Sequence, residues 1–166
     1  SCKMVGSQSI SIDHFLMERA IDLKNLASIL EFDYLTAPGN LKKVFDTLQQ
    51  QLPCFTDIGV IDDEGRHRAY IGPYDLLSKN YKETPWFKMI VQKDLYISDV
   101  FLGFRKEPHF IIGVKQMTKE GFWILRATVD TEYFERLVTE VLSKRDGDAY
   151  VVNRDGIFQT TPRWGG

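Results

Sequence analysis

Five short segments that suit β-strands fall into a group of two followed by a group of three. Each is rich in apolar and β-branched residues and is bounded by turn residues. Two of the turns, residues 62–65 and 118–121, are polar and end in glycine, which is typical of hairpins. The predicted strands are residues 55–61, 66–71, 96–102, 109–117 and 122–129.

Helical periodicity brackets these strands and separates the two groups. Apolar residues at steps of three and four predict one long helix over residues 9–31 with a single apolar stripe. That stripe can serve the core of the domain, a dimer partner, or both. Residues 83–91 predict a helix between the strand groups, with Pro85 tolerated in its first turn. The remaining predicted helices are residues 41–52 and 131–144.

The order of these elements predicts the α+β class. A long N-terminal helix precedes a five-stranded antiparallel sheet, and a helical crossover divides the sheet into two strands and three strands. This is the PAS-like layout.

Composition excludes several kinds of function. Hydrophobic residues make up 43% of the chain and charged residues 27%, with a net charge of -2, which is the balance of a soluble globular protein. A nucleic-acid surface needs clustered cations, and the sequence has no Lys/Arg block. The longest apolar run is far shorter than the ~20 residues that span a bilayer. No nucleophile elbow or phosphate loop is present, so we expect a non-catalytic chain without a cofactor.

The two cysteines and three histidines do not predict a metal site. Cys2 and Cys54 form no CxxC motif, and His14, His67 and His109 are scattered along the chain without ligand spacing. A disulfide between the two cysteines is compatible with an oxidising compartment. Because Cys2 lies near the terminus, we expect two free thiols instead.

One short motif occurs twice. Residues 60–65 (VIDDEG) recur as residues 151–156 (VVNRDG), each directly after a predicted helix and at the start of a hairpin. A repeated motif at this spacing is compatible with a duplicated structural unit. The second copy is followed by too few residues to close a core, so we expect a second PAS-like unit that begins near residue 148 and is cut short. The alternative is coincidence of a common hairpin motif.

Several blocks of the sequence together resemble the sensor region of double Cache histidine kinases. They are DIGVIDDEGRHRAYIGPYDL, NYKETPWFKMI, YISDVFLGFRKEPHFIIGVK, WILRATVDTEYF and, near the end, VVNRDGIFQTTPRWGG. The resemblance implies the periplasmic part of a bacterial inner-membrane receptor, held between two membrane helices, with a ligand in the membrane-distal unit. Since the chain begins at Ser1 rather than Met, we expect a fragment of that receptor, with hydrophobic segments on both sides in the full-length gene.

The resemblance also implies a domain division. Residues 1–52 are expected to form a helical stalk with a second helix, and residues 53–130 the membrane-distal sensor domain. Residues 131–147 are expected to form a connecting helix, and residues 148–166 the start of the membrane-proximal unit.

In a PAS-like domain the small-molecule pocket lies between the sheet and the crossover. The candidates from those parts of the chain are Tyr70, Tyr74, Trp86, Tyr96 and Asp99. Aromatic walls with a few polar groups suit a small ligand. The alternative is that the aromatic side chains are simply core, which we favour for the neighbouring Phe87.

Charged candidates follow from the same resemblance. In amino-acid-binding relatives an aspartate at the place of Asp130 holds the ammonium group, although an aspartate there also suits a helix N-cap. Those relatives carry an arginine where this chain has Thr84, a departure that weakens the case for an amino acid. Arg105 and His109 are candidate substitutes for binding an anion. Arg126 alternates with apolar residues, so it faces either solvent or the pocket, and the sequence leaves this open.

The leading hypothesis is a ligand-sensing module whose ligand is an amino acid, an organic acid or an amine, with a homodimer formed through the N-terminal helix. The output of the parent protein can be a histidine kinase, a chemoreceptor or a cyclase. The competing hypothesis is a ligand-free structural or dimerisation module with the same fold.

Overall fold

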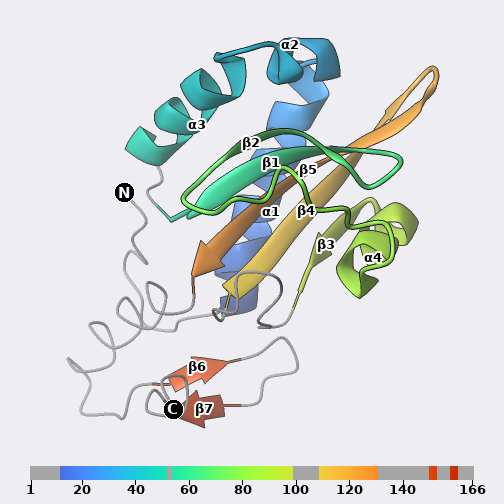
Figure 1. Ribbon diagram of the computed structural model, residues 1–166. Helices are drawn as coiled ribbons and strands as arrows, with labels where there is room; N and C mark the ends of the chain where they lie inside the picture. The colour runs from blue at the N-terminus through green and yellow to red at the C-terminus, as the bar shows by residue number, and fades with distance from the viewer. Residues whose placement is uncertain (1–11, 52–53, 99–108, 131–149, 153–157, 161–166) are drawn as a thin grey trace.

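The computed structural model describes residues 12–51, 54–98, 109–130, 150–152 and 158–160 (Figure 1). Five strands form an antiparallel sheet in the order β2-β1-β5-β4-β3. This is the predicted PAS-like α+β fold. The strands are β1 (Asp57–Asp62), β2 (His67–Ile71), β3 (Leu95–Ile97), β4 (His109–Thr118) and β5 (Gly121–Asp130).

Helices cover both faces of this sheet. The long helix α1 (Ile12–Ile29) runs behind the sheet in Figure 1, and the crossover helix α4 (Pro85–Lys93) lies on the other face beside β3. Two further helices, α2 (Phe32–Thr36) and α3 (Asn40–Gln51), follow α1 and contact β1 and β2. No helix within the described ranges combines the length and the apolar content that a bilayer crossing requires.

The predicted stripe of α1 forms the main core with the sheet. Its members Phe15, Leu16, Ala20, Leu23 and Ala27 are buried. They pack in one cluster with alternate sheet residues, which include Ile58, Val60, Phe110, Ile112 and Leu125. Burial of this apolar area is the main stabilisation that a helix-on-sheet layer provides.

A smaller cluster fills part of the opposite face. It consists of Ile61, Tyr81, Trp86, Phe87, Ile90, Ile111 and Ile124. Helix α4 starts at Pro85, two residues after the predicted start at residue 83, and ends at Lys93. The C-cap residue Asp94 has a φ of 67°, and its N–H bonds the carbonyl of Ile90. We refer to this side of the sheet, with α4 and the loop of residues 72–84 over it, as the lid face.

The turn between β1 and β2 is docked onto the lid loop. Within the turn, the carboxylate of Asp62 accepts bonds from the N–H groups of Glu64 and Arg66, the turn chemistry expected for this acidic run. The carbonyl of Gly65 accepts the N–H of Tyr81 at 2.8 Å, and the side chain of Asn80 donates to the carbonyl of Glu64. These bonds fix the lid loop at one end.

The five strands of the main sheet and helices α1, α3 and α4 agree with the sequence prediction apart from their ends. The short helix α2 was not predicted, because residues 32–36 make a single turn with too little periodicity to detect. Strand β3 ends at Ile97, before the predicted end. The predicted helix over residues 131–144 lies outside the described residues. A separate hairpin pairs β6 (Tyr150–Val152), which includes the first two residues of the second copy of the motif, with β7 (Phe158–Thr160), which follows that copy.

The expectation of two free thiols is wrong. Cys54 is buried and disulfide-bonded. Its only candidate partner within the chain is Cys2, which lies outside the described residues. The position of a cysteine in the sequence does not fix its distance from another cysteine in the fold, so nearness to the terminus was a poor guide.

Two glycines provide a matched test of how tightly the β1–β2 turn packs on the lid loop. Gly65 and Gly39 have nearly the same positive φ, 83° and 82°. A Cβ on Gly65 would lie 2.5 Å from the backbone nitrogen of Lys82, whereas one on Gly39 would meet nothing within 4 Å. We expect Gly65→Ala to lower the free energy of unfolding by roughly 1–3 kcal/mol more than Gly39→Ala, because backbone atoms cannot rotate away. Urea denaturation of both variants measures this difference, and equal losses would contradict the docking.

Candidate functional site

One residue from each of the five strands forms a row across the lid face. Tyr70 of β2 pairs with Gly59 of β1, and Gly59 pairs with Arg126 of β5. Arg126 in turn pairs with Gly113 of β4, which pairs with Tyr96 of β3. An arginine thus stands at the centre of the sheet, with a glycine on each side and a tyrosine at each edge.

The two glycines leave space for the side chains that lie over them. A Cβ on Gly113 would overlap with the end of the Ile90 side chain from α4. A Cβ on Gly59 would lie 2.7 Å from Nε2 of His67 and 3.3 Å from Nη2 of Arg126. Gly113 therefore lets α4 approach the sheet, and Gly59 lets Arg126 and His67 approach each other, both on the lid face.

The adjacent row holds a buried carboxylate. Asp57 of β1 is fully buried and pairs in register with Thr128 of β5. It accepts hydrogen bonds from Thr128 Oγ1 at 2.6 Å and from the hydroxyl of Tyr70 at 2.8 Å. Its Oδ1 lies 3.8 Å from Nη2 of Arg126. A buried carboxylate needs such partners, because loss of hydration is costly.

Arg126 is only 2% exposed and is surrounded by aromatic rings. Its guanidinium carbon lies 6.0 Å from the ring centre of Tyr70 and 5.8 Å from that of Tyr81. Within the part of the chain that the structure describes, its Nε and Nη2 atoms have no hydrogen-bond partner. The arginine that the sequence could not orient therefore points into the interior beneath the lid.

His67 completes the polar cluster, which we define as Asp57, His67, Tyr70, Arg126 and Thr128. Its Nδ1 lies 2.8 Å from the carbonyl of Leu76 in the lid loop. Because a carbonyl only accepts, Nδ1 carries the proton of the neutral ring and Nε2 is left as an acceptor. No described residue donates to that Nε2.

The environment of the cluster sets its protonation. Burial, together with the nearby charge of Arg126, lowers the pKa of His67 to about 4 from its usual 6.5. His67 is therefore neutral at pH 7. Burial and the adjacent Asp57 raise the pKa of Tyr70, so this phenol stays protonated and donates.

The structure brings together some of the predicted site residues. Tyr70 and Tyr96 stand at the two ends of the central row. The backbone of Tyr74 hydrogen-bonds the side chain of Tyr70. Trp86 is buried on the same face, with its ring centre 4.9 Å from that of Tyr81. Phe87 is buried too, as favoured from the sequence.

Other predicted residues lie at the edge of the cluster or outside the described chain. His109 is buried and pairs in register with Asp130. Asp130 lies two residues after Thr128 on β5, in the next row of the same face. Asp99 and Arg105 lie outside the described residues, and only the backbone of Asp130 is described. Thr84 precedes α4 and donates its hydroxyl to the carbonyl of Tyr81, so it serves the local turn.

Sequence reasoning missed Asp57, His67, Tyr81 and Thr128. A signal was present for two of them: Asp57 and Thr128 interrupt otherwise apolar strands, as Arg126 does. A polar residue inside a buried strand has to find a partner, so three such interruptions point to one shared cluster. His67 and Tyr81 gave no such signal, because only the folded structure places His67 of β2 and Tyr81 of the lid loop near Arg126.

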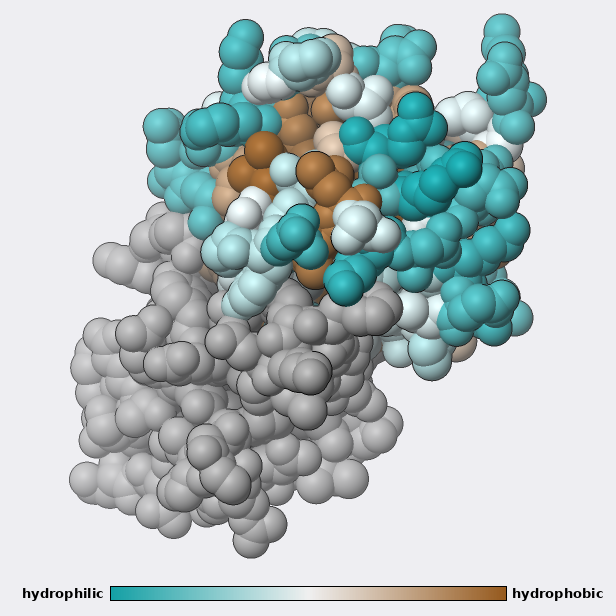
Figure 2. Space-filling model, viewed as in Figure 1, coloured by the Kyte–Doolittle hydropathy of each residue, from teal (hydrophilic) through white to brown (hydrophobic). Residues whose placement is uncertain are grey.

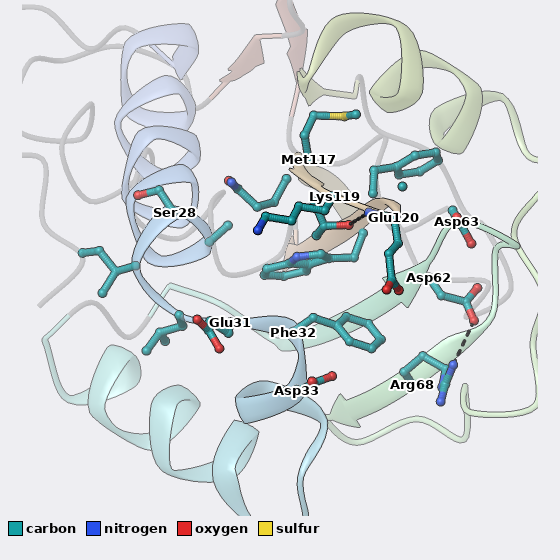
Figure 3. A pocket seen from close by; sticks show the side chains of 18 of the residues that line it. Ser28, Glu31, Phe32, Asp33, Asp62, Asp63, Arg68, Met117, Lys119 and Glu120 are labelled. Atoms are coloured by element: carbon teal, nitrogen blue, oxygen red, sulfur yellow. Dashed lines mark hydrogen bonds and ion pairs between the residues drawn. The ribbon is translucent and has the colours of Figure 1, made fainter.

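An open groove of about 700 Å³ lies elsewhere, between the end of α1, α2 and the β4–β5 hairpin (Figure 3). Asp62 lies on one wall and pairs with Arg66 and Arg68 at 3.3 and 3.4 Å. Burial alone would raise the pKa of Asp62, but bonds from the backbone of Arg66 and Glu64 and from the two arginines lower it. Hydrophilic residues also cover most of the described surface in Figure 2. The groove has the polar, paired character of an ordinary surface.

Comparison with known proteins gives similarity at the level of structure. No protein-family model matches the sequence, and a search of curated proteins finds no match. Solved structures do match. The extracellular domain of vpHK1S-Z8, a protein assigned as a histidine kinase, has a TM-score of 0.63 at 16% identity, over 90% of this chain and 64% of that structure.

Two chemoreceptor domains match as well. The ligand-binding domain of Campylobacter jejuni Tlp3 in complex with 4-methylisoleucine has a TM-score of 0.59 at 11% identity, over 87% of this chain and 58% of that structure. The domain of the Pseudomonas aeruginosa amino-acid chemoreceptor PctC in complex with GABA has a TM-score of 0.58 at 15% identity, over 90% and 66%. The chain thus spans less than two thirds of each of these structures and shares their fold.

The depressed pKa of His67 predicts a loss of stability in mild acid. The unfolded chain binds a proton near pH 6.5 and the folded chain only near pH 4. The free energy of unfolding should therefore fall as the pH falls through this window, by up to about 3 kcal/mol from this group. We expect a smaller fall in His67→Gln, because this substitution removes the group whose pKa is depressed. Urea titrations at several pH values across this window measure the free energy of unfolding. Identical pH profiles for wild type and His67→Gln would contradict the prediction.

Proposed function

We propose that this chain is the ligand-sensing, extracytoplasmic part of a bacterial membrane receptor, and that a small polar molecule binds at the polar cluster on the lid face. One observation carries the proposal. Where a structural core would be apolar, this face buries Asp57, His67 and Arg126, and the latter two keep polar atoms without a described partner. Such atoms are costly unless something binds them.

The structural neighbours support a sensory role. They include extracellular or ligand-binding domains of proteins assigned as histidine kinases and of chemoreceptors. Tlp3 was solved with 4-methylisoleucine and with L-valine, and PctC with GABA. For this chain we propose an amino acid, an organic acid or an amine as ligand. A histidine kinase is the proposed output, with a chemoreceptor or a cyclase as alternatives.

Two observations support the proposed location and organisation. The disulfide at Cys54 suits the periplasm or cell exterior, where disulfides persist. The β6–β7 hairpin at the repeated motif supports a second unit that begins near residue 148, beyond a connecting segment of residues 131–147.

Lys115 offers a route from the lid face to α1. Its Nζ donates to the carbonyl of Val91 at 2.7 Å and pairs with Asp94 at 3.1 Å, both at the end of α4. Its own carbonyl accepts Nζ of Lys24, which belongs to α1 on the opposite face, at 2.6 Å. A ligand that binds more tightly to one of two positions of α4 would favour that position. It would therefore also shift the preferred position of α1, through Lys115 of β4.

The competing function is a ligand-free structural module. The buried Trp86 and Phe87 and the fully bonded carboxylate of Asp57 favour it, because they fill space and satisfy charge without a guest. Binding distinguishes the two functions.

A thermal-shift screen with amino acids, organic acids and amines is the test. A ligand at a hundred times its Kd adds about 2.7 kcal/mol of stability, enough to raise Tm by several degrees. We expect Tyr70→Phe, which alters the cluster, to reduce the shift. Glu120→Gln, which alters the groove of Figure 3, should leave it intact. A broad library without any shift would refute the sensor proposal for this unit.

We also propose a homodimer through α1. Met17, Ile21 and Ile29 expose 37%, 47% and 75% of their surface on this helix, outside the buried stripe. Exposed apolar side chains on one helix suit a second copy of the helix. Light scattering over a range of concentrations should show a dimer that Ile21→Glu weakens. Leu77→Glu is the control, since Leu77 is 56% exposed but lies in the lid loop. A wild-type chain that stays monomeric at every concentration would exclude the interface.

A further inference from the structure

We infer that the ligand of the lid face carries a carboxylate, that Arg126 binds this carboxylate through the edge formed by Nε and Nη2, and that a donor group beside the carboxylate meets Nε2 of His67. This inference rests on the proposed sensory function and specifies its chemistry.

The free edge of the guanidinium is the first step. Nε and Nη2 are neighbouring nitrogens, so their N–H groups point the same way. Both are buried, and neither has a described hydrogen-bond partner. A carboxylate offers two oxygens at matching spacing, which makes it the natural two-bond partner of this edge.

The resident carboxylate does not fill that role. Asp57 lies 3.8 Å from Nη2, beyond hydrogen-bond distance. Its oxygens already accept the hydroxyls of Thr128 and Tyr70. Asp57 thus balances the charge of Arg126 at a distance and holds Tyr70 in place, while the guanidinium edge keeps its capacity for another acceptor.

His67 adds a second requirement. Its Nδ1 is occupied by the carbonyl of Leu76, so its buried Nε2 accepts. The position that a Cβ of Gly59 would take lies within 3.3 Å of both this Nε2 and Nη2 of Arg126. An acceptor and a donor edge side by side fit a carboxylate with a hydroxyl or an ammonium on the neighbouring carbon, as in 2-hydroxy acids and α-amino acids.

The competing explanation is structural. Arg126 packed between Tyr70 and Tyr81 can stabilise the fold through cation–π contacts, with interior water on the remaining N–H groups. If Arg126 is purely structural, its N–H groups should bind no added carboxylate. If Arg126 binds the ligand, they should bind even small carboxylates.

Four probes of nearly equal size separate the two: propionate, L-lactate, L-alanine and lactamide. NMR titration of the wild-type chain follows the Nε–H resonance of Arg126, and calorimetry gives affinities. We expect the carboxylates to move this resonance and lactamide to leave it in place. We also expect lactate or alanine to bind at least about tenfold more tightly than propionate, because only they can donate to His67. Whichever of the two binds more tightly identifies the donor as hydroxyl or ammonium.

The matched variants are Arg126→Lys and Arg68→Lys. Lysine keeps the charge but loses the two adjacent N–H donors, so we expect Arg126→Lys to lower the affinity for lactate or alanine by roughly tenfold or more. Arg68→Lys changes an exposed arginine on the groove and should have no effect. The titration of the wild-type chain stands by itself if Arg126→Lys does not fold.

The outcomes also separate this inference from the sensory function. A Nε–H resonance that no carboxylate moves, an unchanged affinity in Arg126→Lys, or equal binding of lactamide and lactate would overturn the carboxylate assignment. The sensory function would survive any of these if a library ligand still raised Tm and Tyr70→Phe reduced that shift. It fails only when no ligand stabilises the chain.

Discussion

The burial of a charged pair beneath the lid is the constraint around which the rest of the domain is arranged. Arg126 and Asp57 stand on neighbouring rows of the sheet, almost without exposure. Charges in such a place are tolerated only with partners and space. Glycines at positions 59 and 113 provide the space, and Thr128 and Tyr70 provide hydrogen bonds for the carboxylate. After burial itself, the nearby charge of Arg126 is the next largest cause of the low pKa of His67.

The two faces of the sheet differ in composition. One face is apolar and joins α1 to the strands, which gives the domain its stability. The other is mixed, with an apolar cluster under α4 next to the polar cluster. Lys115 links them, since it binds the end of α4 with its side chain and α1 through its carbonyl. The sheet therefore has one apolar face that carries the main core and one mixed face that carries the polar cluster.

Much of the fold could be predicted because its signals are local. The stripe of α1, the glycine turns and the crossover helix with Pro85 in its first turn each depend on a few neighbouring residues. The site was harder to predict. Tyr70, Trp86 and Tyr96 do lie on the lid face, but Asp57, His67 and Thr128 were missed and Arg126 was left open. Their roles depend on strand register and on the lid loop, which join positions far apart in the chain.

The sequence by itself thus determined the α+β class, the division of the sheet by a helical crossover and the apolar stripe on the first helix, because periodicity and turn chemistry act over a few residues. Only the tertiary structure decided that Arg126 faces inward, that His67 is a neutral acceptor and that Cys54 is bonded. The physical reason is that burial, and with it pKa and hydrogen-bond demand, is a property of packed neighbours. Those neighbours come from strands and loops that only folding brings together.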